Sequence, residues 1–163
     1  MEKASTTLSF ELFFEAERRR LFRALYLMTG SVQEAEELAQ DAFLNVWERW
    51  DRVSAMADPD GYLYRTAMNL HRSRLRRMMR AAKLPFSPER SVEPYGAADA
   101  RDAVVRAIAA LSPRQRQALV LTELLDRDTD EAAKSMHVSS STVRSLVSVG
   151  HKRMRAAMEA SDE

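Results

Sequence analysis

The chain has 163 residues, a formal net charge of +1 and 30% charged residues, as expected of a folded protein with one ordinary domain or two small ones. It contains no cysteine, which excludes disulfides, thiolate metal sites and catalytic thiols, and its three histidines are scattered. No stretch approaches the roughly 18 apolar residues of a membrane span, and the N-terminus lacks a signal-peptide pattern, so we expect a cytoplasmic protein without membrane insertion.

Apolar residues recur at spacings of three and four, and only four glycines and five prolines interrupt them, which predicts an all-α fold without strands. In the N-terminal half, Gly30 should end the first helix and Ser31 should cap the second. The segment DRVSAMADPDG is expected to be a loop, with Pro59 starting the next helix. The predicted helices of this half are 9–28, 32–50 and 59–82.

The stretch LPFSPERSVEPYGAADA holds three of the five prolines and no helical periodicity, which predicts a flexible linker. A further set of helices begins near Arg101, and SPRQRQALVLTEL opens with a serine cap and a proline at the first helical position. A short helix over 130–136, a tight turn over 137–139 and a last helix over 140–158 follow. The predicted organisation is therefore two small helical domains, 1–82 and 101–163, joined by a linker over 83–100.

The predicted helix 59–82 carries positive charge on one face. Its segment YLYRTAMNLHRSRLRRMMR holds six arginines, and no acidic residue occurs between Gly61 and Pro88. The expected buried side comprises Leu63, Tyr64, Ala67, Met68, Leu70, Leu75, Met78 and Met79. The opposite side comprises Tyr62, Arg65, Asn69, Arg72, Ser73, Arg76, Arg77 and Arg80. Arginine suits phosphates, asparagine can pair with base edges and tyrosine can stack on unpaired bases, so this mixture favours nucleic-acid binding over a merely solvated basic face.

The second predicted helix has the opposite charge. Residues 31–60 hold eight acidic residues against two arginines. One face combines Glu34, Glu37, Gln40, Asp41, Leu44 and Glu48. The apolar face combines Ala35, Leu38, Ala39, Ala42 and Val46. An exposed leucine among carboxylates suggests a docking surface for a basic protein partner, and an acidic face that is only solvated is the alternative.

The last two predicted helices have helix-turn-helix spacing. Their facing apolar residues are Ala132, Ala133, Met136, Val138, Val143, Leu146 and Val147. The exposed side of the last helix carries Ser141, Arg144, Ser148, Lys152 and Arg155. Short polar residues at the helix start with basic residues further along suit the major groove of DNA, which we favour over an ordinary helical hairpin.

Four segments together resemble a known family. EAEELAQDAFLNVW, DPDGYLYRTAMNLHRSRLRR, AIAALSPRQRQALVLTELL and SSSTVRSLV occur in the order and spacing of an extracytoplasmic-function (ECF) sigma factor of bacterial RNA polymerase, in the sigma-70 family. The likeness extends from about Phe10 to Arg155. It implies a sigma-2 domain up to residue 82 and a sigma-4 domain from residue 101.

The resemblance also implies roles for individual residues. Residues matching the segment that docks on the clamp helices of the largest polymerase subunit, with one leucine beside them, are Glu37, Leu38, Gln40, Asp41 and Leu44. Residues on the helix that opens and reads the minus-10 promoter element or holds its backbone are Tyr62, Arg65, Asn69, Arg72, Arg76, Arg77 and Arg80. Residues on the minus-35 reading helix are Ser141, Thr142, Arg144, Ser145, Ser148 and Lys152. The loop over 51–60 would help to trap a flipped base.

The partners implied by the resemblance are core RNA polymerase, through its clamp helices and flap region, promoter DNA and an anti-sigma factor. The linker would run through the polymerase toward the RNA exit path. No catalytic residue, metal or cofactor is expected.

The sequence departs from the family pattern at several places. His137 stands at the turn that usually carries glycine, so we expect it in a left-handed conformation. Leu146, Val149 and Gly150 occupy places where arginines are frequent, which predicts fewer contacts to the minus-35 element. Ala132 replaces a larger aliphatic residue, which predicts a less stable sigma-4 domain.

Two other classes of function compete with this interpretation. A stand-alone helix-turn-helix transcriptional regulator would explain the C-terminal half, and specific duplex binding by the isolated protein would favour it, but the acidic and basic helices would then have no role. An enzyme acting on nucleic acid would need convergent carboxylates or a histidine with a nucleophile. The nearest pair, Asp58 and Asp60, looks like loop and cap residues.

Overall fold

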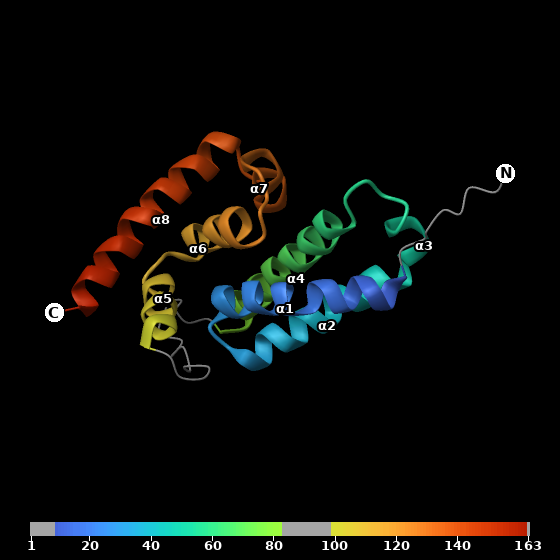
Figure 1. The fold of residues 1–163 in the computed structure, drawn as a ribbon, viewed down its shortest axis with the longest axis horizontal. Coiled ribbons are helices and arrows are strands. Elements are labelled where there is room, and N and C mark those ends of the chain that lie inside the picture. Colours follow the sequence, from blue (N-terminus) through green and yellow to red (C-terminus); the bar gives the residue numbers. More distant parts are fainter. Residues whose placement is uncertain (1–8, 83–98, 163) are drawn as a thin grey trace.

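The computed structural model describes residues 9–82 and 99–162, and all regular structure in these ranges is helical (Figure 1), as predicted. The N-terminal group consists of α1 (Phe10–Thr29), α2 (Val32–Glu48), α3 (Trp50–Val53) and α4 (Pro59–Ala82). The C-terminal group consists of α5 (Asp99–Ala109), α6 (Pro113–Leu119), the π-helical turn η1 (Val120–Leu124), α7 (Thr129–Met136) and α8 (Ser140–Ser161). Most of the predicted linker lies outside the described residues, and α5 begins two residues before the predicted start at residue 101.

Local capping signals set most helix ends. Gly30 ends α1 in a left-handed conformation with φ 69°, and the Ser31 side chain accepts a hydrogen bond from the Glu34 amide to begin α2. Ser112 and Gln115 form a reciprocal capping box at the start of α6, with Pro113 at the first helical position. These boundaries agree with the prediction because each depends on residues close in sequence.

An aromatic cluster joins α1 to α2 and α3. It comprises Phe10, Phe13, Phe14, Phe43 and Trp50. The ring centroids of Phe13 and Trp50 lie 5.1 Å apart, which fixes the chain just after α2. Two predictions for this part of the chain are therefore wrong. The second helix does not continue to residue 50, and the segment after it is not entirely a loop. The second helix ends at Glu48, and Trp50 begins the short helix α3.

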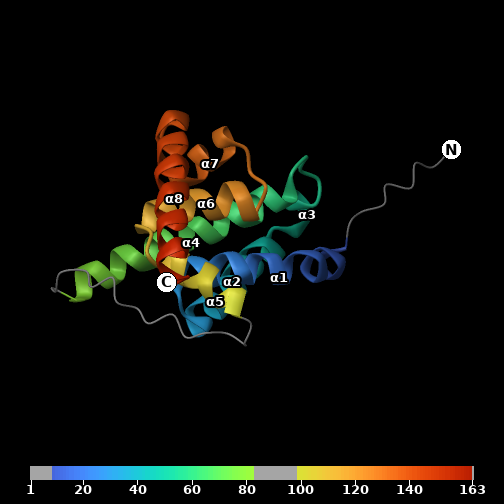
Figure 2. The same ribbon diagram turned by 60° about the vertical axis from the view of Figure 1, so that its left-hand side comes forward.

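Helix α4 buries its first half and exposes its second half. Leu63, Tyr64, Ala67 and Met68 are buried as predicted, and Leu70 and Leu75 are half-buried. Met78 and Met79 were also expected on the buried side, but they are exposed. The reason is that the last turns of α4 project beyond the other helices of the N-terminal group (Figure 2), so their apolar side is not covered.

The helix-turn-helix of the C-terminal group has the predicted contacts. Ala132, Ala133 and Met136 on α7 and Val143 on α8 are buried together, and Val138, Leu146 and Val147 pack against them. Helices α5 and α6 pack on the other part of α8. Gly150 is buried, and a Cβ atom there would lie 2.9 Å from Leu119 Cδ1. The expectation that residue 150 occupies a place for a DNA-binding arginine is therefore wrong, because this side of α8 is packed against α6.

The two groups also pack against each other. Helix α4 contacts α7, and α1 contacts α5, α6 and η1. Both groups contribute to one buried apolar cluster, for example through Leu25 of α1 and Leu121 of η1. The sequence predicted the two groups and their order, but not this shared core.

Candidate nucleic-acid and polymerase interface

The basic face of α4 is present along most of the helix. Arg65 and Asn69 are exposed, as are the predicted backbone-binding residues Arg76, Arg77 and Arg80. Arg65 Nε donates to the carbonyl of Gly61, one turn earlier. An exposed asparagine between arginines is therefore available for contact with a nucleic acid.

Two residues predicted on the same face of α4 are only partly exposed to solvent. Tyr62 is half-buried and packs against the core. Arg72 is half-buried, its Nη2 donates to the Ser135 carbonyl of α7 at 2.5 Å, and its Nη1 donates to Asn69 Oδ1 at 3.3 Å. Burial lowers the pKa of Arg72, with a smaller contribution from the neighbouring charge of Arg76. The face is therefore partly occupied by the C-terminal group.

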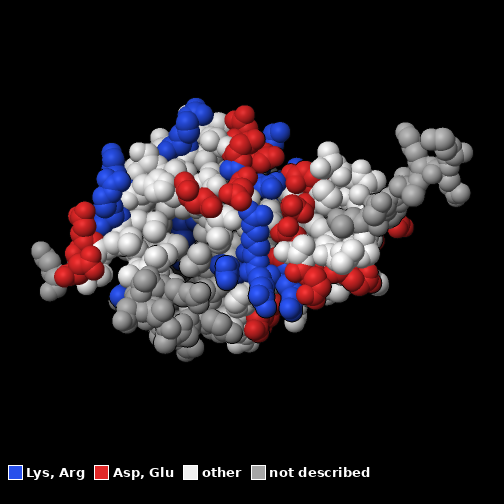
Figure 3. All heavy atoms as spheres, viewed as in Figure 1, with Lys and Arg blue, Asp and Glu red and all other residues white. Residues whose placement is uncertain are grey.

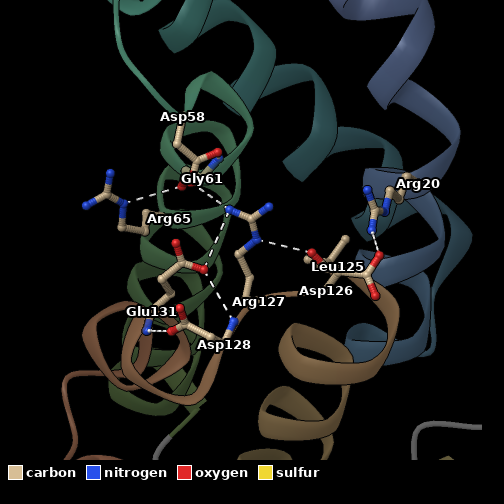
Figure 4. Close-up of polar contacts among 9 residues, drawn as sticks. All are labelled: Arg20, Asp58, Gly61, Arg65, Leu125, Asp126, Arg127, Asp128 and Glu131. Carbon is tan, nitrogen blue, oxygen red and sulfur yellow. Dashed lines mark hydrogen bonds and ion pairs between the residues drawn. The ribbon is translucent and has the colours of Figure 1, made fainter.

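The turn before α4 is organised by Asp58 (Figure 4). Its Oδ1 accepts from the Gly61 amide at 3.0 Å, and its Oδ2 accepts from Arg127 Nη1 at 2.7 Å. The first contact is a helix-start contact, which confirms that Asp58 is a cap residue. The second ties the turn between α3 and α4 to the chain segment that follows η1.

On α2, the predicted docking residues divide into three kinds. Gln40, Asp41 and Leu44 are exposed, whereas Leu38 is buried in the core. Glu37 is half-buried and accepts a hydrogen bond from Arg74 of α4, which lowers the pKa of the Glu37 carboxyl. This carboxylate therefore links α2 to α4, although the Glu37 side chain is still 44% exposed.

A groove between α2 and α4 brings the two charged helices together. It is lined by Glu37, Leu38, Asp41, Leu70, Arg74, Arg77, Met78 and Ala81. One turn beyond this groove, Leu44 and Trp47 are 56% and 59% exposed, which makes an apolar patch beside acidic residues. Sequence reasoning missed Trp47, although its position three residues after Leu44 places both on one helix face.

The predicted reading face of α8 is open. Ser141, Arg144, Ser145, Ser148 and Lys152 are exposed, and Thr142 is half-buried. Ser139 caps the helix by accepting from the Thr142 amide, and His137 adopts φ 55° and ψ 44°, which confirms its left-handed conformation. The start of α8 is thus held at a fixed angle to α7.

A second, mainly apolar groove runs along α8. Arg155, which was predicted on the same exposed side of the helix as Arg144 and Lys152, lines this groove instead, together with charged residues such as Glu123 and Glu159. Its apolar lining combines Leu27, Val104, Ile108, Leu111, Leu119, Val120, Leu124, Met154 and Met158. Arg116 crosses its base, donating to the carbonyls of Met28 and Leu111, and burial lowers the pKa of Arg116. Sequence reasoning assigned no residues to a flap contact, because this groove is assembled from helices distant in sequence.

The described residues contain no group of three or more side chains placed to hold a metal ion. None of the helices in these ranges is long and apolar enough to cross a membrane.

Comparisons with known proteins agree with this division of the chain. Sigma-70 region 2 matches residues 13–81, and Sigma-70, region 4 matches residues 101–154. The chain is 27% identical over 158 residues to the RNA polymerase sigma-E factor of Streptomyces avermitilis, covering 95% of this chain and 88% of that protein. It is 31% identical over 157 residues to the ECF RNA polymerase sigma factor SigJ of Mycobacterium tuberculosis, covering 88% of this chain and 49% of that protein.

A solved structure has a similar fold. The sigma factor RpoE from Bartonella quintana, crystallised in complex with the anti-sigma factor NepR, gives a TM-score of 0.75 at 21% identity, covering 92% of this chain and 96% of that one.

Region 2 followed by region 4, with a basic helix in the first and a helix-turn-helix in the second, defines a sigma factor of the sigma-70 family. The chain belongs to this family, in its extracytoplasmic-function branch. It directs promoter recognition by RNA polymerase and is not itself an enzyme, as the sequence predicted.

Proposed function

We propose that α4 opens and reads the minus-10 element and that α8 reads the minus-35 element. The observation that carries the first part is the exposed face of α4, where Arg65 and Asn69 are followed by three exposed arginines and no acidic residue. The second part is supported by the exposed polar start of α8, with Arg144 and Lys152 further along. In this assignment residues 1–82 act as sigma-2, 83–100 as a linker and 101–163 as sigma-4.

Docking on core polymerase uses two further surfaces in this proposal. The exposed acidic and apolar residues of α2, including Asp41, Leu44 and Trp47, would bind the clamp helices of the largest subunit. The apolar groove along α8 would take the flap region, because a concave apolar surface suits an amphipathic helix.

We further propose that the protein acts in the cytoplasm, where its polymerase partner lies, and that an anti-sigma factor controls it. The similar fold seen in a complex of another sigma factor with an anti-sigma factor supports this choice of partner class. With no cysteine in the chain, redox sensing would belong to that partner.

In vitro run-off transcription of genomic DNA, with core polymerase alone and with the protein added, tests the proposal. We expect a defined set of new 5′ ends, with the minus-10 region of each becoming reactive to a single-strand-specific reagent. Asn69→Ala should reduce promoter opening by about five- to 150-fold and weaken minus-10 selectivity, since a base contact contributes about 1 to 3 kcal/mol. Met79→Ala, a change at a 63% exposed residue on the other side of α4, is the control.

Other results would contradict the assignment. If the Asn69→Ala variant opened promoters as well as the Met79→Ala variant, α4 would contribute charge but would not read bases. Specific binding of promoter duplex without polymerase, together with no new transcripts, would instead favour a stand-alone regulator.

A further inference from the structure

Arg127 connects the C-terminal group to the start of α4. Its side chain is only 14% exposed, and its Nη1 lies 2.7 Å from Asp58 Oδ2 and 3.9 Å from Glu131 Oε2. The guanidinium carbon lies 5.2 Å from the ring centroid of Tyr64, within cation–π distance. Arg127 Nε also donates to the Leu125 carbonyl at 3.1 Å, which fixes the guanidinium plane (Figure 4).

The preceding residue makes a second connection, to α1. Arg20 Nη2 pairs with Asp126 Oδ2 at 2.5 Å, and Arg20 Nε donates to the Leu124 carbonyl at 3.2 Å. Asp126 has φ 51°, a left-handed turn that lets two consecutive side chains reach different helices (Figure 4). Acidic and basic side chains are accordingly interleaved across the middle of the face shown in Figure 3.

Contacts between the two groups include residues of the surface that we assign to the minus-10 element. The loop before α4 is engaged through Asp58, and Arg72 of the reading face is engaged by the Ser135 carbonyl of α7. The reading face of α8, in contrast, stays exposed. Packing of the two groups therefore engages one edge of the minus-10 surface, at Arg72 and Asp58, while Arg65 and Asn69 stay exposed and the reading face of α8 is open.

The packed arrangement is also too short for a promoter. Elements centred about 25 base pairs apart are separated by roughly 85 Å at 3.4 Å per base pair. Here α7 lies in hydrogen-bond contact with α4, and α8, with 22 residues, is about 33 Å long. Both elements can be bound at once only after the groups separate.

We propose that Arg20, Asp58, Asp126 and Arg127 form a latch that holds sigma-4 packed against sigma-2, at one edge of the minus-10 face, in the free protein, and that the latch must open before both promoter elements are engaged. The proposal rests on the proposed function for the identity of the covered surface. The existence of the closed state can be measured without it.

A reversible covalent lock tests the consequence for transcription. The chain has no native cysteine, so Arg20→Cys with Asp126→Cys creates one pair that a short bis-maleimide with a reducible spacer can join. The cross-linked full chain should give at least about tenfold fewer run-off transcripts with core polymerase on the genomic template, and reduction of the spacer should restore them. Each single-cysteine variant, treated in the same way, is the control for chemistry and for strain at position 126.

A fluorescence measurement on the free protein tests the latch itself. Donor and acceptor dyes on Arg19→Cys and Ala156→Cys, both exposed sites outside the latch, report separation of α1 from α8. Adding Arg127→Ala should raise the ratio of open to closed molecules about tenfold, because an ion pair and a cation–π contact are lost. Arg114→Ala removes the same charge from an exposed site on α6 and should leave the ratio unchanged.

The two measurements separate the possible failures. Equal transcription by locked and released protein would overturn the proposal. If neither form gave promoter-specific transcripts, the proposed function would fail, and the fluorescence result would decide the latch. An Arg127→Ala variant no more open than Arg114→Ala would overturn the latch in either case.

Discussion

A buried carboxylate links α1 to α4 inside the N-terminal group. Glu17 is 8% exposed, and the Tyr64 hydroxyl donates a hydrogen bond to it. Burial raises the pKa of Glu17, and this effect outweighs the opposing hydrogen bond from Tyr64. The folded protein therefore binds a proton at Glu17 more tightly than the unfolded chain does. Between the ordinary pKa of 4.5 and the raised value, the free energy of unfolding falls as the pH rises.

Glu17→Gln should remove this dependence on pH. The glutamine carbonyl can still accept the Tyr64 hydrogen bond but carries no charge, so we expect the variant to gain stability relative to wild type as the pH rises from 4.5 to neutral. Glu17→Ala leaves the Tyr64 hydroxyl unpaired and should cost about 1 to 3 kcal/mol. Urea denaturation of all three proteins across this pH range measures both effects, and a difference between wild type and Glu17→Gln that does not change with pH would contradict the explanation.

Residue exposure could be predicted from the sequence where a single helix determines it. Arg65 and Asn69 lie on the solvent side of α4 because helical periodicity places them there. The bond between Glu37 and Arg74 could not be predicted, because these residues lie 37 positions apart and only the packing of α2 on α4 brings them together. The exposure of Met79 has a similar origin, since periodicity does not indicate where a neighbouring helix stops.

At the scale of elements, α2 offers a direct test of polymerase docking. Glu37 is hydrogen-bonded to Arg74 of α4, so a substitution there could change both polymerase affinity and the packing of α2 on α4. Leu44 and Trp47 are largely exposed and avoid this problem. The double variant Leu44→Ala with Trp47→Ala should lower affinity for core polymerase by at least about tenfold, since exposed aromatic and leucine side chains at an interface centre contribute about 1 to 2 kcal/mol or more. The fold should be unaffected.

Leu12→Ala on α1 provides the matched control, because Leu12 is 66% exposed and was assigned no contact with polymerase. Competition for core polymerase against a labelled sigma factor gives the relative affinities. Equal competition by the double variant and the control would place the docking surface elsewhere.

Helix boundaries were predicted well where caps are local and less well where packing sets them. The bounds of α4 agree with the prediction, and Ser112 and Pro113 begin α6 as expected. In the π-helical turn η1, the Leu125 amide donates to the Val120 carbonyl. No capping or helix-breaking residue in the sequence indicates this turn. It lies where the C-terminal group contacts α1, so it belongs to the packing of the whole molecule.

At the scale of the whole molecule, the sequence indicated two helical groups but not their common core. Apolar periodicity shows which face of a helix is buried, and it does not show which partner buries it. Leu121 and Leu125 follow α6 in the C-terminal group, yet they belong to a buried cluster that includes residues of α1 and α4. The contacts that close this interface join residues 63 to 106 positions apart.

The shared core predicts that the two groups unfold together. Both tryptophans, Trp47 and Trp50, lie in the N-terminal group, so their fluorescence reports only that group, whereas far-UV circular dichroism reports the helices of both. For wild type, urea curves from the two probes should coincide, as in a two-state transition. Arg127→Ala should weaken the interface by about 1 to 3 kcal/mol and separate the curves, because the groups would then unfold with their own midpoints. Separate curves in wild type at low salt would show that the interface contributes too little free energy to couple the two groups.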